Sequence, residues 1–205
     1  MAIKFQYNKT SLGEMGKQLK MRQKALPTLK SKEAALRAEV KKAKDMAEEF
    51  EEKQRRLIDS YDYMISLWGE FDPDLLKITD IELGIQKIAG VKIPALKGIK
   101  FDEKKYDLFS SPVWFADGVE LLKKIAQFQI EYEIFSRKTE LLDHARKKTT
   151  QKVNLYEKVQ IPGYEAAVLK IKRFLEDEEN LSKSAQKIVK SRQDQTEKQR
   201  SEETV

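Results

Sequence analysis

Residues 10–68 read TSLGEMGKQLKMRQKALPTLKSKEAALRAEVKKAKDMAEEFEEKQRRLIDSYDYMISLW, and this stretch decides the fold. Seam residues, all but three of them apolar, recur along it at alternating steps of three and four. They are Leu12, Met15, Leu19, Arg22, Leu26, Leu29, Glu33, Leu36, Val40, Ala43, Ala47, Phe50, Gln54, Leu57, Tyr61, Met64 and Trp68. A seam at a period of about 3.5 residues is typical of a coiled coil. The pattern predicts an N-terminal region, residues 1–68, made of one long helix with a local bend at Pro27.

A second seam predicts the partner helix, residues 112–190. Its members are Leu142, Arg146, Thr149, Val153, Tyr156, Gln160, Tyr164, Ala167, Ile171, Phe174, Glu178, Leu181, Ala185 and Ile188. Ser110 or Ser111 is the expected N-cap, and Pro112 suits the first turn. Two consecutive steps of four meet at Gln160, next to Pro162, so we expect local unwinding and a kink there. Residues 191–205 contain no apolar residue before Val205 and are expected to be a flexible tail.

Residues 69–111 form a central insert with a different composition. From about residue 80 to residue 101, apolar residues alternate with polar ones or glycine, which predicts two strands of a β-hairpin. A three-residue loop of Ile88, Ala89 and Gly90, with Gly90 left-handed, is the expected turn. The expected pairs on one face are Ile85 with Ile93 and Leu83 with Ala95.

The expected fold class is therefore all-α, a long antiparallel two-helix coiled coil with a short central β-hairpin. Charged residues make up 36% of the chain, whereas glycines and prolines number only 8 and 5, a balance that favours long helices. Such a charged surface fits a single elongated domain, because an elongated particle exposes more surface per residue than a sphere.

Composition excludes most kinds of active site. The chain has no cysteine and a single histidine, His144, so metal sites built on either residue type are not expected. No glycine-rich phosphate loop is present. We predict no catalytic residue, no cofactor and no metal. Positive and negative charges are interspersed, which argues against a nucleic-acid groove. No apolar run approaches the ~20 residues of a membrane span, so a cytoplasmic chain without direct membrane insertion is expected.

The beginning of the second helix is apolar on more than one face. Six large residues there cannot all face one partner helix, because successive residues are rotated by about 100°. They are the candidates for partner binding: Trp114, Phe115, Phe128, Ile130, Ile134 and Phe135. Core packing is the alternative for the tryptophans.

The stretch TTQKVNLYEKVQIP, residues 149–162, resembles the TTQRVNxxEKVxIP signature of the D subunits of V-type and archaeal-type rotary ATPases. The matching residues are Thr149, Thr150, Gln151, Val153, Asn154, Glu157, Lys158, Val159, Ile161 and Pro162. IAGVKIP, residues 88–94, is similar to the hairpin turn of that family. The N-terminal segment departs from the commoner members, so the resemblance is to a divergent bacterial branch.

The resemblance implies a role as the central stalk, or rotor shaft, of a rotary ATPase. A shaft couples ATP hydrolysis or synthesis in the catalytic ring to H⁺ or Na⁺ transport through the membrane rotor. The implied partners are the catalytic and regulatory head subunits, the small F subunit of the rotor and the membrane-ring cap subunit. The implied location is cytoplasmic and peripheral to the membrane, within a membrane-bound complex. A non-catalytic cytosolic coiled-coil scaffold or adaptor is the alternative function. The sequence leaves open which ion is moved and in which direction the complex works.

Overall fold

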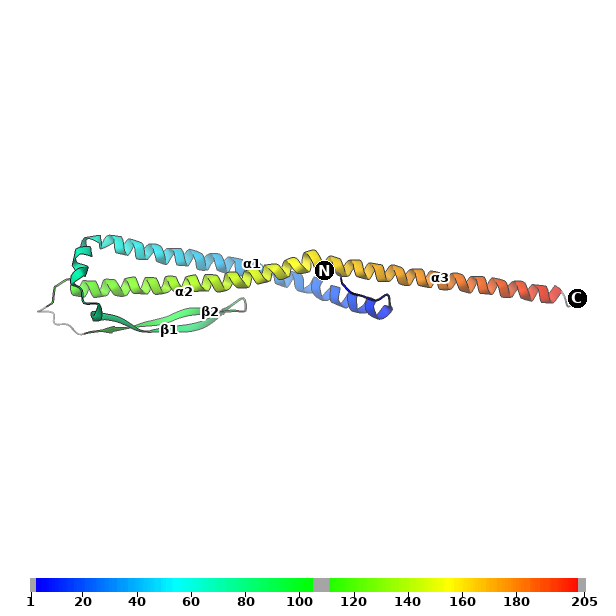
Figure 1. Cartoon of the computed structure of the whole chain (residues 1–205), viewed down its shortest axis with the longest axis horizontal. Helices are drawn as coiled ribbons and strands as arrows, with labels where there is room; N and C mark the ends of the chain where they lie inside the picture. The colour runs from blue at the N-terminus through cyan, green and yellow to red at the C-terminus, as the bar shows by residue number, and fades with distance from the viewer. Residues whose placement is uncertain (1–2, 105–110, 203–205) are drawn as a thin grey trace. The chain divides into compact units, whose positions relative to one another are not determined.

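The computed structural model describes residues 3–104 and 111–202, so Ser110 as a possible N-cap lies outside the described residues. The elements are α1 (Lys9–Ser60), two 3₁₀ helices η1 (Asp62–Glu70) and η2 (Pro73–Leu75), β1 (Leu76–Ile88), β2 (Val91–Glu103), α2 (Phe115–Asn154), a π-helix η3 (Leu155–Gln160) and α3 (Ile161–Glu202). The predicted fold class is confirmed: two long helical stretches flank one antiparallel β-hairpin (Figure 1). The chain divides into two units, one of Lys30–Thr150 and one of Met1–Leu29 with Gln151–Val205.

In the unit Lys30–Thr150, α1 and α2 pack side by side in opposite directions (Figure 1). Leu36 and Ala43 of α1 share a buried core with Leu142 of α2. Farther along α1, the ring of Phe50 stacks on that of Phe135 with 5.5 Å between centroids. The residue numbers rise on α1 while they fall on α2, so the pair is antiparallel, as predicted.

In the unit formed by the chain ends, α1 also pairs with a helix of opposite direction. Arg22 bonds to Gln160, and Tyr7, just before α1, packs its ring on Phe174. Ala167 and Ile171 of α3 are buried. Within this unit the same antiparallel order therefore holds.

Every residue of the first predicted seam, from Leu12 to Trp68, is buried or half-buried, including its three polar members. The second seam behaves in this way only as far as Ile171, and from Phe174 onward its members are exposed. Lys9, the first residue of α1, lines a groove with Leu175 and Glu179. Because α1 begins there, the later part of α3 has no α1 residue beside it, and Leu181 is 73% exposed.

The hairpin corrects the predicted loop and register. Its loop has two residues, Ala89 at φ 48° and Gly90 at φ 80°, so Gly90 is left-handed as expected but Ile88 belongs to β1. Two positive φ angles are the signature of a type I′ turn. Ile85 consequently lies opposite Pro94, and Gln86 lies opposite Ile93. The predicted pairs of Ile85 with Ile93 and of Leu83 with Ala95 were wrong by one residue.

That register sets which face of the hairpin is buried. Ile93 packs against Leu36, Ala43 and Leu142 and is 2% exposed. Ile85 belongs to the opposite face and is 78% exposed. A slip of one residue exchanges the faces of a strand, so the two-residue loop decides which isoleucine enters the core.

Three element boundaries also differ from the prediction. The first long helix ends at Ser60 instead of Trp68, where the Ser60 hydroxyl donates to the Leu57 carbonyl and a 3₁₀ helix follows. The hairpin is longer than residues 80–101 and spans Leu76–Glu103. Regular helix continues past residue 190 to Glu202. Flexibility of residues 191–205 stays a prediction.

We expect Leu142→Ala to lower the free energy of unfolding by about 2–5 kcal/mol, because a fully buried leucine leaves a cavity when it is truncated. Leu181→Ala is the matched control on the exposed part of α3 and should change stability by less than about 0.5 kcal/mol. Urea unfolding followed by circular dichroism measures both. Equal losses would contradict the burial of Leu142.

Candidate partner-binding surface

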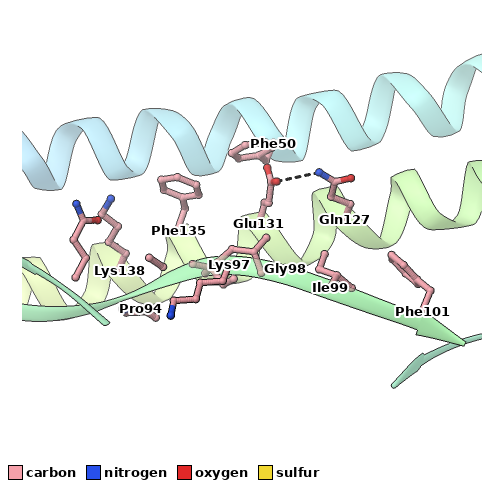
Figure 2. A pocket seen from close by; sticks show the side chains of 14 residues that line it. Phe50, Pro94, Lys97, Gly98, Ile99, Phe101, Gln127, Glu131, Phe135 and Lys138 are labelled. Carbon is pink, nitrogen blue, oxygen red and sulfur yellow. Dashed lines mark hydrogen bonds between the residues drawn. The ribbon is translucent and has the colours of Figure 1, made fainter. Parts of the chain in front are cut away.

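A groove of about 650 Å³ lies between the hairpin and the helix pair in the unit Lys30–Thr150 (Figure 2). The helices contribute Phe50, Ile134 and Phe135, and β2 contributes the residues from Pro94 to Ile99 and Phe101. Figure 2 shows β2 passing in front of α2 at this site. Much of the lining of the groove is therefore aromatic or aliphatic.

Charged and amide side chains line the same groove. Lys97 and Lys138 line the groove together with Glu131, and the Gln127 amide donates to the Glu131 carboxylate at 3.3 Å. The Lys138 ammonium lies 5.0 Å from the centre of the Phe135 ring. A surface that mixes aromatic and aliphatic residues with charged and amide ones is compatible with a protein–protein interface.

The six predicted partner-binding residues divide into two groups. Ile134 and Phe135 line the groove, and Phe128 lies beside it, with its ring centroid 6.4 Å from that of Phe50. Ile130 is half-buried on the same helix. Trp114 and Phe115 instead belong to an aromatic cluster outside the groove.

The aromatic cluster joins the start of α2 to the 3₁₀ helix η1. Trp114 meets Trp68 edge to face at 5.6 Å between ring centroids, and Phe71 packs on both Trp114 and Phe115. A Cβ added at Gly118 would lie 3.1 Å from the Trp114 ring, so the indole sits directly on the backbone of α2. Both side chains therefore pack within this cluster, and partner binding by either of them stays a prediction.

The sequence interpretation missed the exposed apolar row on β1. Ile81, Leu83 and Ile85 are all exposed although they are large and apolar. Their alternation was visible in the sequence. The predicted register put Ile85 on one face with Ile93, whereas the observed register places Ile85 opposite Pro94 and on the other face from the buried Ile93.

Of the first two residues of the signature, Thr149 is buried in α2 and Thr150 bonds across the helix pair in the unit Lys30–Thr150. Thr149 is buried, and its hydroxyl donates to the Ala145 carbonyl at 2.8 Å. The Thr150 hydroxyl donates to the Glu33 carboxylate of α1 at 3.2 Å. The hydrogen bond from Arg37 lowers the pKa of Glu33, so this carboxylate is charged and accepts both bonds at neutral pH.

The rest of the signature belongs to the other unit and covers the π-helix η3. Gln151, Asn154, Glu157 and Pro162 are exposed and Val153 is half-buried, so they do not gather into one pocket. The Ile161 amide donates to the Tyr156 carbonyl five residues back, which is π-helical bonding. Proline clashes with the carbonyl four residues before it in a regular helix, and a wide turn just ahead of Pro162 relieves that clash.

Arg22 of α1 binds the π-helix across the seam. Its Nε donates to the Gln160 side chain at 2.6 Å, and its guanidinium lies 4.4 Å from the centre of the Tyr164 ring and 5.9 Å from that of Tyr156. Gln18 on the same helix accepts a further bond. A planar guanidinium satisfies all these contacts at once, which an ammonium cannot do.

Over residues 3–104 and 111–202, no three His, Cys, Asp or Glu side chains are grouped closely enough to hold a metal ion. Among the helices of the same residues, none combines the length and the apolar content that a membrane span requires.

Comparison with known proteins gives a consistent family. A family model for the D subunit of ATP synthase matches residues 11–191. The D subunit of a V-type ATP synthase from Borreliella burgdorferi is 32% identical over 92% of this chain and 94% of its own length. The corresponding D subunits from Chlamydia muridarum and Chlamydia trachomatis are 28% and 27% identical, over 82% and 94% of this chain and 85% and 97% of their own lengths.

We expect Arg22→Lys to destabilise the chain by about 1–2 kcal/mol, because lysine keeps the charge but loses the hydrogen bond to Gln160 and the planar stacking on Tyr164. The control is Arg55→Lys, which changes an exposed ion pair with Glu51 and should cost less than about 0.5 kcal/mol. Urea titrations of both variants measure the difference. Equal effects would mean that Arg22 behaves as an ordinary surface charge.

Proposed function

This chain belongs to the family of ATP synthase D subunits, and from this we propose that it is the central stalk of a V-type ATPase or ATP synthase. As the rotor shaft it couples ATP hydrolysis or synthesis in the catalytic ring to H⁺ or Na⁺ transport through the membrane rotor. The complex is membrane-bound, and this chain lies on its cytoplasmic side.

The observation that carries the proposal is the unbroken seam of α1. Each seam residue of α1, from Leu12 to Leu57, is buried or half-buried, so the helix is held against its partner along its length. Interlocked side chains make a two-helix coil stiffer than a single helix, because bending or twisting must separate packed surfaces. Stiffness is what a shaft needs to transmit torque.

Polar contacts across the seam support the same role. Glu33 with Thr150 and Arg22 with Gln160 fix the register of the helices in their respective units. Sliding one helix along the other would separate these partners and leave half-buried polar groups unpaired. Among the signature residues, we assign Thr150, which bonds to Glu33 across the helix pair, to this register-fixing role rather than to chemistry.

The two units offer different surfaces to partners. The groove of Ile134 and Phe135 lies in the unit Lys30–Thr150, which we assign to the small F subunit of the rotor and to the membrane-ring cap. In the other unit, α3 exposes Leu181, Ala185 and Ile188 at steps of four and three. A narrow apolar stripe among charged residues suits contact with a surrounding ring, and we assign it to the catalytic and regulatory head subunits.

We predict that Ile134→Asp reduces co-purification with the small rotor subunit, because a carboxylate placed in an apolar groove loses its hydration on binding. Deletion of residues 181–205 should leave that association intact and lower ATP-driven ion transport. Affinity purification of the co-expressed complex, with transport measured in vesicles, tests both changes. If the deletion abolished co-purification with the small rotor subunit while Ile134→Asp left it intact, the partners of the two units would be assigned the wrong way round.

The role assigned to the chain is not catalytic. We expect the isolated, rigorously purified chain to release no phosphate from ATP above the level of a mock purification. Hydrolysis that increases in proportion to the amount of chain would contradict the shaft assignment.

A further inference from the structure

β1 has one paired edge and one open edge. The described strands form a two-stranded sheet in which β1 pairs only with β2. β2 is half-buried along much of its length and lines the groove against α2, whereas β1 is exposed from Lys77 to Lys87 apart from Gly84. Figure 1 shows the hairpin beside α2 along both of its strands. The open edge belongs to a strand of 13 residues, Leu76–Ile88.

Only part of this edge is regular and free of the usual protection against pairing. Proteins block open edges with charged side chains, proline, bulges or very short strands. The register with β2 is irregular between Ile78 and Asp80 and between Glu82 and Leu83, so the regular edge runs from Leu83 to Ile88. β1 carries lysines only near its ends, at Lys77 and Lys87, and no proline. Between them the side chains of Ile81, Leu83 and Ile85 are 38%, 55% and 78% exposed on one face.

The hairpin geometry identifies which backbone groups point outward. In a two-residue type I′ hairpin the residues that flank the loop, here Ile88 and Val91, form a hydrogen-bonded pair, and bonded and non-bonded pairs alternate from there. Ile85 and Pro94 are therefore a non-bonded pair, which agrees with the missing N–H of proline. Leu83 and Leu96 are the next such pair. The N–H and C=O groups of Leu83 and Ile85 thus point away from β2.

The charges along β1 restrict what the edge accepts. Asp80 and Glu82 form ion pairs with the same side chain, Lys100 of β2. One ammonium faces two carboxylates, so this part of the edge has an excess negative charge. A lysine or arginine of an incoming chain would complement it.

We propose that β1 accepts a β-strand from another protein of the same rotary complex, which enlarges the hairpin to a three-stranded sheet. The incoming segment is extended, carries apolar side chains alongside Ile81, Leu83 and Ile85, and places a basic residue next to Asp80 and Glu82. Main-chain hydrogen bonds to Leu83 and Ile85 supply the pairing, and the alternating side chains supply the specificity. The identity of the partner as a component of the rotary complex rests on the proposed function.

Residue-resolved hydrogen–deuterium exchange on the isolated chain and on the purified complex tests the strand pairing. In the isolated chain the amides of Leu83 and Ile85 exchange fast, and those of Gly84 and Gln86 are already protected by β2. In the complex the first two slow by at least about tenfold, because each gains a hydrogen bond. If this protein is part of the purified complex but the amides of Leu83 and Ile85 still exchange fast, the strand proposal is wrong and the proposed function stands. A chain that is absent from the complex would overturn the proposed function as well.

Two substitutions at one site separate backbone pairing from side-chain contact. Ile85→Pro removes an outward N–H, and the hairpin should tolerate it because residue 85 belongs to a non-bonded pair and donates no hydrogen bond to β2. Ile85→Ala removes most of the same side chain and keeps the N–H. We expect the proline variant to bind its partner about fivefold to tenfold more weakly than the alanine variant, as loss of one hydrogen bond predicts. Circular dichroism and urea unfolding confirm that both variants retain the fold.

Equal affinities of the two Ile85 variants would overturn pairing through the main chain. A further contrary outcome is self-association: light scattering that finds a dimer of the isolated chain, abolished by Ile85→Pro, would make a second copy of this chain the occupant of the edge.

Discussion

The constraint on which this structure depends is that a helix with one neighbour has one narrow stripe to bury. α1 buries such a stripe, because every seam residue from Leu12 to Leu57 is buried or half-buried. Elsewhere on the helix, charges form ion pairs one turn apart, as between Glu49 and Lys53, and these are worth only fractions of a kcal/mol each. The seam therefore carries the stability, and the surrounding charge keeps the remaining surface hydrated.

An apolar seam alone specifies its register poorly, because leucine packs nearly as well after a slide of one heptad. The polar seam residues remove that ambiguity. Glu33 needs Thr150 and Arg37, and Arg22 needs Gln160 and Tyr164, so each has its partners at one position only. A polar residue in a seam lowers stability relative to an apolar one and in return selects a single arrangement.

Periodicity predicted the helices well, since side-chain spacing along a helix is fixed by backbone geometry. It also placed Arg22 and Glu33 in the interface, although not the aromatic rings that Arg22 contacts, because those lie more than a hundred positions away in the sequence. The hairpin register was missed by one residue: nothing local shows that Ala89 adopts a positive φ angle. The sequence could not distinguish the partner-binding candidates from one another, because tertiary packing decides their surroundings. It buries Phe115 in an aromatic cluster and leaves Ile134 in the lining of the groove.

The π-helix Leu155–Gln160 and Pro162 depend on each other in a way that constrains how this chain can change. Each wide turn holds one residue more than an α-turn. Loss of a single residue from this segment would restore regular helix and bring the proline ring against a carbonyl. Replacement of the proline would instead remove the reason for the wide turn, and relaxation to regular helix would rotate all later side chains of α3 by about 100° relative to α1. Length and composition are thus linked at this point of the sequence, so that an insertion or deletion is tolerated only together with a matching substitution.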